Sequence, residues 1–147
     1  MKISTKGEYG IRAMLELAHR YGEGYVQSSE IARVREIPEN YLYQLLITLR
    51  KAGLIRSRRG PQGGHMLARS PERISLAETV IALEGPVTPV ACVQHDIDEC
   101  PFGEACAVRD VWKRIADSTL HILQTTTIAD LTQSEREKAQ DMDRRTA

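Results

Sequence analysis

Apolar residues recur at intervals of three and four over most of the first half of the chain. This spacing places them on one face of a helix. It predicts helices over residues 8–21, 30–34 and 38–52, with Ser28 or Ser29 capping the second and a leucine-rich face on the third. Helix, short helix, tight turn and helix form the helix-turn-helix arrangement, whose last helix enters the major groove of DNA.

After the third helix the helical spacing gives way to short apolar runs. Residues 54–58 and 65–68 are typical of strands, and the Gly- and Pro-rich stretch between them is typical of a loop. A hairpin directly after a recognition helix is a wing. A fourth helix is expected over residues 74–83, with Ser75 and Glu78 forming a capping box at its start.

A long amphipathic helix is predicted in the last third of the chain, beginning near Glu104. It spans about twenty residues, roughly 30 Å, and its stripe consists of Val108, Val111, Trp112, Ile115, Thr119, Ile122 and Leu123. Because so small a domain cannot cover such a helix, we expect the stripe to pack against a second copy of the chain. A short final helix should end at Leu131, and the polar residues after it are expected to be disordered.

The predicted fold is therefore mainly α, a winged helix-turn-helix with a small β-hairpin wing and a long C-terminal dimerisation helix. The expected divisions are a DNA-binding domain over residues 1–84, a cysteine-containing loop over 85–106, the dimerisation helix and short final helix over 107–132, and a disordered tail over 133–147.

A net charge of zero conceals an uneven distribution. Residues 1–69 hold twelve Lys and Arg against six Asp and Glu, and the remaining residues hold eight against fourteen. A basic front half suits a module that meets phosphate with one end only. Because no apolar run is long enough for a signal peptide or a membrane span, the expected compartment is the cytoplasm.

Five cations fall between residues 50 and 59 with no acid among them. They coincide with the end of the recognition helix and with the wing, so we interpret them as phosphate contacts rather than as a solvated basic face. Gln and Asn on the third helix can pair with adenine, whereas Tyr41 has core packing as its alternative role. Arg59 at the wing tip is placed to enter a minor groove. The residues predicted to bind DNA are Ser28, Asn40, Tyr41, Tyr43, Gln44, Arg50, Arg58, Arg59 and Gly60.

The three cysteines of the chain, Cys92, Cys100 and Cys106, lie within fifteen residues and are spaced C-x7-C-x5-C. Soft sulfur ligands select zinc, cuprous ions or iron–sulfur clusters. Zinc sites usually contain paired Cys-x-x-Cys or Cys/His elements, which are missing here, so zinc is disfavoured. An enzyme is not expected, because no His/Asp pair is positioned to activate a cysteine and there is no phosphate loop.

Four motifs accompany these features, namely KGEYG at residues 6–10, YLYQLL at 41–46, LRKAGL at 49–54 and RGPQGG at 59–64. Together they resemble the IscR-type family of bacterial winged-helix transcriptional regulators. The resemblance runs from Met1 to about Leu131. It implies a homodimer, crossed through the long helix, that binds palindromic promoter DNA and takes no small-molecule substrate or membrane as a partner.

Many members of this family carry an iron–sulfur cluster on three cysteines, and others have none. The resemblance implies a [2Fe–2S] or [4Fe–4S] cluster here, but Arg109 stands where the iron–sulfur regulator proper has a histidine ligand. Nitric-oxide-sensing relatives use a carboxylate from the other subunit near the start of the first helix, where this chain has Glu8. Glu8 is equally explained as an acid that stabilises the helix dipole, and His95 is a rival ligand.

The resulting hypothesis is a repressor whose promoter binding is switched by a cluster that senses redox, nitric oxide or iron status. The alternative is a cluster-free regulator of the same fold, controlled by thiol oxidation or by a partner protein.

Overall fold

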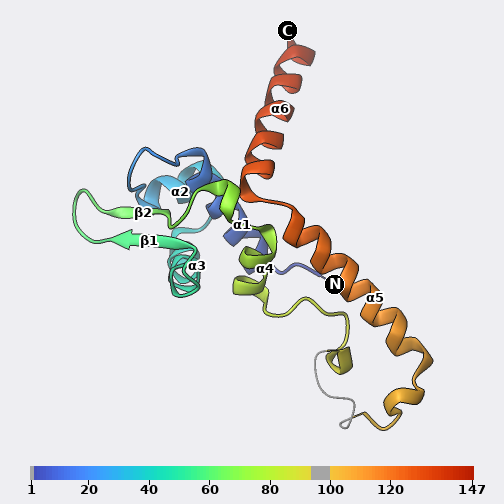
Figure 1. The fold of residues 1–147 in the computed structure, drawn as a ribbon. Helices are drawn as coiled ribbons and strands as arrows, with labels where there is room; N and C mark the ends of the chain where they lie inside the picture. Colours follow the sequence, from blue (N-terminus) through green and yellow to red (C-terminus); the bar gives the residue numbers. More distant parts are fainter. Residues whose placement is uncertain (1, 94–99) are drawn as a thin grey trace.

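The structure is a computed structural model that describes residues 2–93 and 100–147. Along the chain its elements are α1 (Thr5–His19), α2 (Ser28–Arg35), α3 (Glu39–Lys51), β1 (Ile55–Arg58), β2 (Gly64–Leu67), η1 (Pro71–Arg73), α4 (Leu76–Glu84), η2 (Ala91–Val93), η4 (Gly103–Ala105), α5 (Ala107–Thr125) and α6 (Ile128–Thr146). Figure 1 shows a head formed by α1 to α4 and the hairpin, with α5 and α6 extending from it in different directions. The predicted mainly-α fold with a hairpin wing and a long helix near the C-terminus is confirmed.

The helices of the head enclose one apolar core. Leu42, Leu45 and Leu49 of α3 are almost fully buried, and they share a core cluster with Met14 and Leu17 of α1. The apolar face that the spacing predicts for each helix is thus the face that is buried. This packing leaves the polar face of α3 directed outward beside the wing.

The start of α2 differs from the prediction. Ser28 is already helical, Gln27 is the N-cap residue, and no side chain caps the helix. The Gln27 carbonyl accepts backbone hydrogen bonds from Glu30 and Ile31 at 3.1 and 3.2 Å. The prediction of a cap at Ser28 or Ser29 is therefore wrong, because the extended backbone of Gln27 places the first turn one residue earlier.

The wing is a two-stranded antiparallel hairpin in which β1 and β2 pair over their full length. Two contacts attach it to the segment before α2. Val26 and His65 exchange both backbone hydrogen bonds at 2.8 Å. The Gln27 Nε2 group also donates to the Pro61 carbonyl at 3.2 Å. These contacts hold the wing at one position beside α3.

Two glycines let α1 pack directly against α4. A Cβ atom at Gly10 would overlap the side chain of Leu83, and one at Gly7 would overlap that of Glu84. The Glu84 carboxylate accepts hydrogen bonds from the backbone N–H and Oγ of Ser4 at 2.8 and 2.6 Å, and the Oγ bond is the main reason that the pKa of Glu84 is lowered. The start of α1 is therefore joined to the end of α4.

The start of α4 confirms a prediction, whereas the start of α5 corrects one. Ser75 and Glu78 form the expected capping box at α4. Cys106, expected in the first turn of the long helix, is instead the N-cap residue of α5, and its side chain makes no capping hydrogen bond. The reason is that η4 occupies the positions near Glu104 where the helix was predicted to begin.

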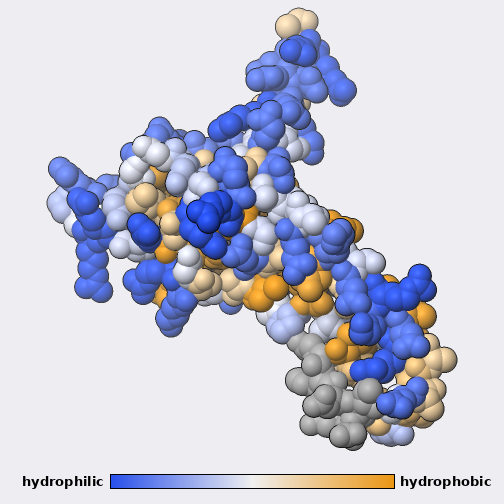
Figure 2. Space-filling view, in the orientation of Figure 1, coloured by the Kyte–Doolittle hydropathy of each residue, from blue (hydrophilic) through white to orange (hydrophobic). Residues whose placement is uncertain are grey.

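The apolar stripe of α5 is divided between two environments. Ala116 is buried and Trp112 and Leu123 are half-buried, so this side of the helix packs against the protein. The side that carries Val108, Val111, Ile115 and Ile122 is exposed. Figure 2 shows hydrophobic surface along the part of the molecule that α5 forms. Even so, none of the helices in the described part of the chain combines the length and apolar composition needed to cross a membrane.

The last helix replaces the short helix and disordered tail expected from residue 133. A capping box of Thr127 and Asp130 starts α6, and Ile128 is fully buried in the core. Beyond its first turns α6 is mostly polar, Met142 being an exposed exception, and some of its side chains pair one turn apart. Such local pairs support a helix that buries no face. Missing apolar periodicity therefore indicated exposure rather than disorder, and this expectation is corrected.

Candidate nucleic-acid interface and cysteine segment

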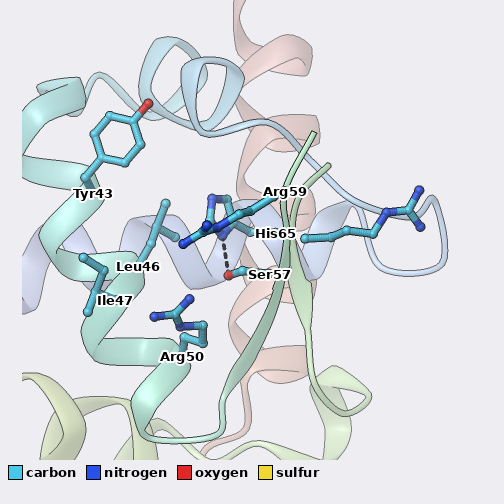
Figure 3. A pocket seen from close by; sticks show the side chains of 8 residues that line it. Tyr43, Leu46, Ile47, Arg50, Ser57, Arg59 and His65 are labelled. Carbon is cyan, nitrogen blue, oxygen red and sulfur yellow. Dashed lines mark hydrogen bonds between the residues drawn. The ribbon is translucent and has the colours of Figure 1, made fainter. Parts of the chain in front are cut away.

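A hollow of about 330 Å³ separates α3 from the wing (Figure 3). We call it the reading recess, and it is lined by Tyr43, Leu46, Ile47, Arg50, Ser57, Arg58, Arg59 and His65. Both α3 and the wing contribute arginines to this lining, which contains no acidic side chain. An apolar wall beside cationic groups suits a DNA backbone phosphate and its sugar.

The three arginines that were predicted to bind DNA do not all point in the same direction. Arg50 lies in the last turn of α3, and in Figure 3 Arg59 extends from the wing over the recess towards α3. Arg58 borders the recess, but its guanidinium lies 5.3 Å from the centroid of the Tyr25 ring, a cation–π contact. Arg50 and Arg59 are therefore the pair that the structure brings together.

The predicted base-reading residues lie on the outer face of α3. Asn40, Tyr43 and Gln44 are exposed. Tyr41 is 39% exposed and meets the Tyr9 ring edge-on, with centroids 5.6 Å apart. The core alternative for Tyr41 is therefore wrong, and this side chain supports α3 against α1 from the surface.

Ser28 at the start of α2 and Gly60 in the wing loop both line a second hollow of about 320 Å³. Gly60 has a φ of 105°, and the Gly63 N–H donates to its carbonyl at 2.9 Å. A Cβ atom at Gly63 would overlap the carbonyl of Arg58. The RGPQGG motif therefore contains glycine where the turn requires a positive φ and close backbone approach.

Sequence reasoning missed His65, which borders both hollows. Its Nδ1 atom lies 2.8 Å from the Oγ of Ser57, its partner across the hairpin. Burial, followed by the nearby positive charge of Arg50, lowers the pKa of His65. The sequence feature that could have identified His65 is its position in the strand that directly follows the wing loop.

An ion-pair network, also missed, ties α6 to the head. Arg35 at the end of α2 donates to Glu16 of α1 at 2.9 Å and to Glu135 of α6 at 2.9 and 3.1 Å. His19 of α1 lies 2.6 Å from the same Glu135 carboxylate. The hydrogen bond from Arg35 is the main reason that the pKa of Glu135 is lowered. The network joins residues more than a hundred positions apart.

The three cysteines are half-buried free thiols. Cys92 lies in η2, which packs against α5, and Cys106 occupies the N-cap position of α5. Within residues 2–93 and 100–147, no three His, Cys, Asp or Glu side chains gather closely enough to hold a metal ion. Glu8 is exposed in the first turn of α1, whereas His95 lies outside the described residues.

By their chemistry these residues fit a sulfur-bound iron site. Three free thiols provide the soft donors that iron–sulfur clusters require. One turn beyond Cys106, the buried Nε of Arg109 has no hydrogen-bond partner among the described residues. An orphaned cationic donor at this position suits an anionic group such as a thiolate-bound cluster.

Comparisons with known proteins identify the family to which this chain is similar. The Rrf2 family, described as iron-dependent transcriptional regulators, matches residues 3–134. The chain is 43% identical over 131 residues to the HTH-type transcriptional regulator CymR of Bacillus subtilis (strain 168), with 89% of each chain covered.

Two solved structures share the fold. That of CymR, the global cysteine regulator of B. subtilis, has a TM-score of 0.76 and 39% identity and covers 91% of this chain and 98% of that one. That of T. potens IscR has a TM-score of 0.75 and 36% identity and covers 94% and 90%. The expectation of an IscR-type winged-helix regulator that is not an enzyme is confirmed. The chain belongs to the Rrf2 family of transcriptional regulators.

Proposed function

We propose that this regulator is a cytoplasmic homodimer that represses transcription by binding a palindromic operator. The observation that carries the proposal is the reading recess, whose cations come from both α3 and the wing. Arg50 and Arg59 bind backbone phosphate and so fix the position of α3 in the major groove. Asn40, Tyr43 and Gln44 then lie at the edges of the bases.

Replacing Arg59 with alanine tests the phosphate contact. Because one charge-assisted hydrogen bond is lost, we expect DNA affinity to fall about tenfold at low salt. The slope of log affinity against log salt should decrease by about one. The measurement is fluorescence anisotropy with a duplex that the protein itself selects from a random-sequence pool. Lys138→Ala removes the same charge from exposed α6 and should leave the slope unchanged; equal slopes for both variants would contradict the proposal.

Dimerisation is proposed through the exposed side of α5. Val111, Ile115 and Ile122 border a shallow groove of about 360 Å³ along this helix. Exposed apolar side chains that follow one face over several turns are typical of an interface between helices. A dimer formed there holds two heads at a separation that a palindromic site requires.

For regulation we propose an iron–sulfur cluster, [2Fe–2S] or [4Fe–4S], on Cys92, Cys100 and Cys106, with Glu8 of the partner subunit as the fourth ligand. The donor chemistry, the orphaned Arg109 Nε and the iron-dependent description of the family support this proposal. Such a cluster supplies a group that oxidant, nitric oxide or iron shortage can change.

The contacts within the chain connect this site to the head. Glu8 lies in the first turn of α1, which packs against α3 and, through Gly7 and Gly10, against α4. If Glu8 bound the iron of a cluster carried by the cysteines of the partner subunit, the tilt of α3 would be restrained relative to the other head. Allosteric coupling of this kind typically amounts to about 1–3 kcal/mol, roughly 5–150-fold in affinity.

Protein purified without oxygen tests the cluster directly. We expect visible absorbance with iron and acid-labile sulfide, and a change of roughly 5–150-fold in operator affinity when the iron is removed at fixed salt. Cys92→Ala should abolish both effects. If Glu8→Ala leaves the absorbance and its decay in air unchanged, Glu8 is not a ligand. Colourless, iron-free protein that still binds DNA would refute the cluster and leave the promoter-binding proposal standing.

A regulator that responds through its thiols, or through a partner protein, is the second candidate. Likeness to a protein described as a global cysteine regulator and the three free, half-buried thiols favour it. In this case oxidation of iron-free protein should alter operator affinity, and Cys→Ser variants should not respond. Mass spectrometry of the oxidised protein identifies the thiol involved.

A further inference from the structure

His65 lies where the wing, α3 and the segment before α2 meet. Its backbone is fixed by both hydrogen bonds to Val26, and its ring contacts the Ser57 hydroxyl. Figure 3 shows the ring on the strand side of the reading recess, with Arg59 crossing over it and Arg50 opposite on α3. The ring is therefore held in place at the surface where a DNA backbone would pass.

Positive charge predominates around His65. The charged and titratable groups that border the two hollows with it are Tyr43, Arg50, Arg58, Arg59 and, on the second hollow only, Glu39. Burial and the charge of Arg50 lower the pKa of His65, so both favour the neutral ring in the free protein. An anion in the recess would offset the arginine charge and favour a protonated ring.

We propose that His65 is a DNA-binding residue that takes up a proton as a backbone phosphate enters the reading recess beside Arg50 and Arg59. The inference rests on the proposed promoter binding, and it adds that binding is coupled to the uptake of one proton by His65. In the protonated ring both nitrogens donate, Nδ1 to the Ser57 hydroxyl and Nε2 to a phosphate oxygen. Because DNA binds the protein with a protonated His65 ring more tightly, the affinity of the protein for DNA rises as the pH falls through the range in which histidine titrates.

The test measures operator affinity between about pH 8 and pH 6 at constant ionic strength. The probe is a short duplex selected by the protein from a random-sequence pool. Because binding favours the protonated ring, wild-type affinity should be roughly three- to fivefold higher at the lower pH. His65→Gln should bind with affinity that varies less than about twofold across this range. His19→Gln is the matched control, because His19 pairs with Glu135 away from the recess, and it should keep the wild-type pH profile.

A second readout uses the wild-type protein alone, so that misfolding of a variant cannot obscure the answer. NMR titration of the His65 ring should give a higher pKa with the duplex than without it. Identical pH profiles for wild type and His65→Gln, or an unchanged ring pKa, would overturn the role of His65 while DNA binding stands. Absence of salt-dependent duplex binding at every pH, with no loss in Arg59→Ala, would instead overturn the proposed function.

Discussion

Replacing Ile115 with glutamate is expected to convert the proposed dimer to a monomer and to lower affinity for a palindromic operator at least about 100-fold. Ile115 is 44% exposed in the single chain and lies near the middle of α5. In a paired helix this position is buried, and a carboxylate placed there loses its hydration without gaining a partner. A monomer also loses the effective concentration that two linked heads have on one site. Light scattering gives the mass, and anisotropy gives the affinity.

Gln124→Glu is the matched control for this variant. Gln124 is exposed on α5, and its position nine residues further along places it half a turn around the helix from Ile115. The Gln124→Glu substitution introduces the same charge on the opposite side of the helix, so the proposed dimer and the operator affinity should be retained. An Ile115→Glu protein that remains dimeric would show that this face of α5 is not the interface.

Arg35→Met should lower the melting temperature by about 5–10 °C. The substitution removes the ion-pair partner of Glu16, which is 7% exposed, and leaves Glu135 paired with His19 alone. Breaking a fully buried ion pair costs about 3–5 kcal/mol, and exposure of Arg35 (16%) and Glu135 (37%) reduces the expected loss to about 2–3 kcal/mol. Since the network joins α6 to α1 and α2, amide exchange in α6 should accelerate as well. Calorimetry and hydrogen exchange measure the two effects.

Arg20→Met provides the comparison, because Arg20 pairs with the exposed carboxylates of Glu23 and Glu30. Exposed pairs contribute about 0–1 kcal/mol, so this variant should lose roughly 3 °C or less. A loss as large as that of Arg35→Met would mean that burial of the network does not matter.

The acid dependence of stability follows from the same network. Because Arg35 lowers the pKa of Glu135 in the folded chain, the stabilisation is complete above the ordinary Glu pKa of about 4.3. It is lost as the pH falls through the lowered value. Arg35→Met should therefore show a shallower loss of stability below about pH 4.3 than the wild type.

Predictions from the sequence succeeded where an element depends on its near neighbours. The leucine spacing of α3, the glycines of the RGPQGG turn and the capping box of Ser75 and Glu78 all act over a few residues. Predictions failed at the cap of α2 and at Cys106, where neighbouring turns competed. They also failed in the part of α6 beyond its first turns, which buries little apolar surface. Both kinds of failure concern choices that hydrophobic spacing does not encode.

The sequence by itself determined which faces are buried, where the wing turns, and that basic residues and thiols are concentrated in separate short segments. Each of these properties follows from the identity and spacing of residues close together in the chain. Only the tertiary structure decided that Arg50 and Arg59 share one recess with His65, and that Arg35 joins α1 to α6. These groups come from different elements, and the distances between elements are set by how their buried faces pack against one another.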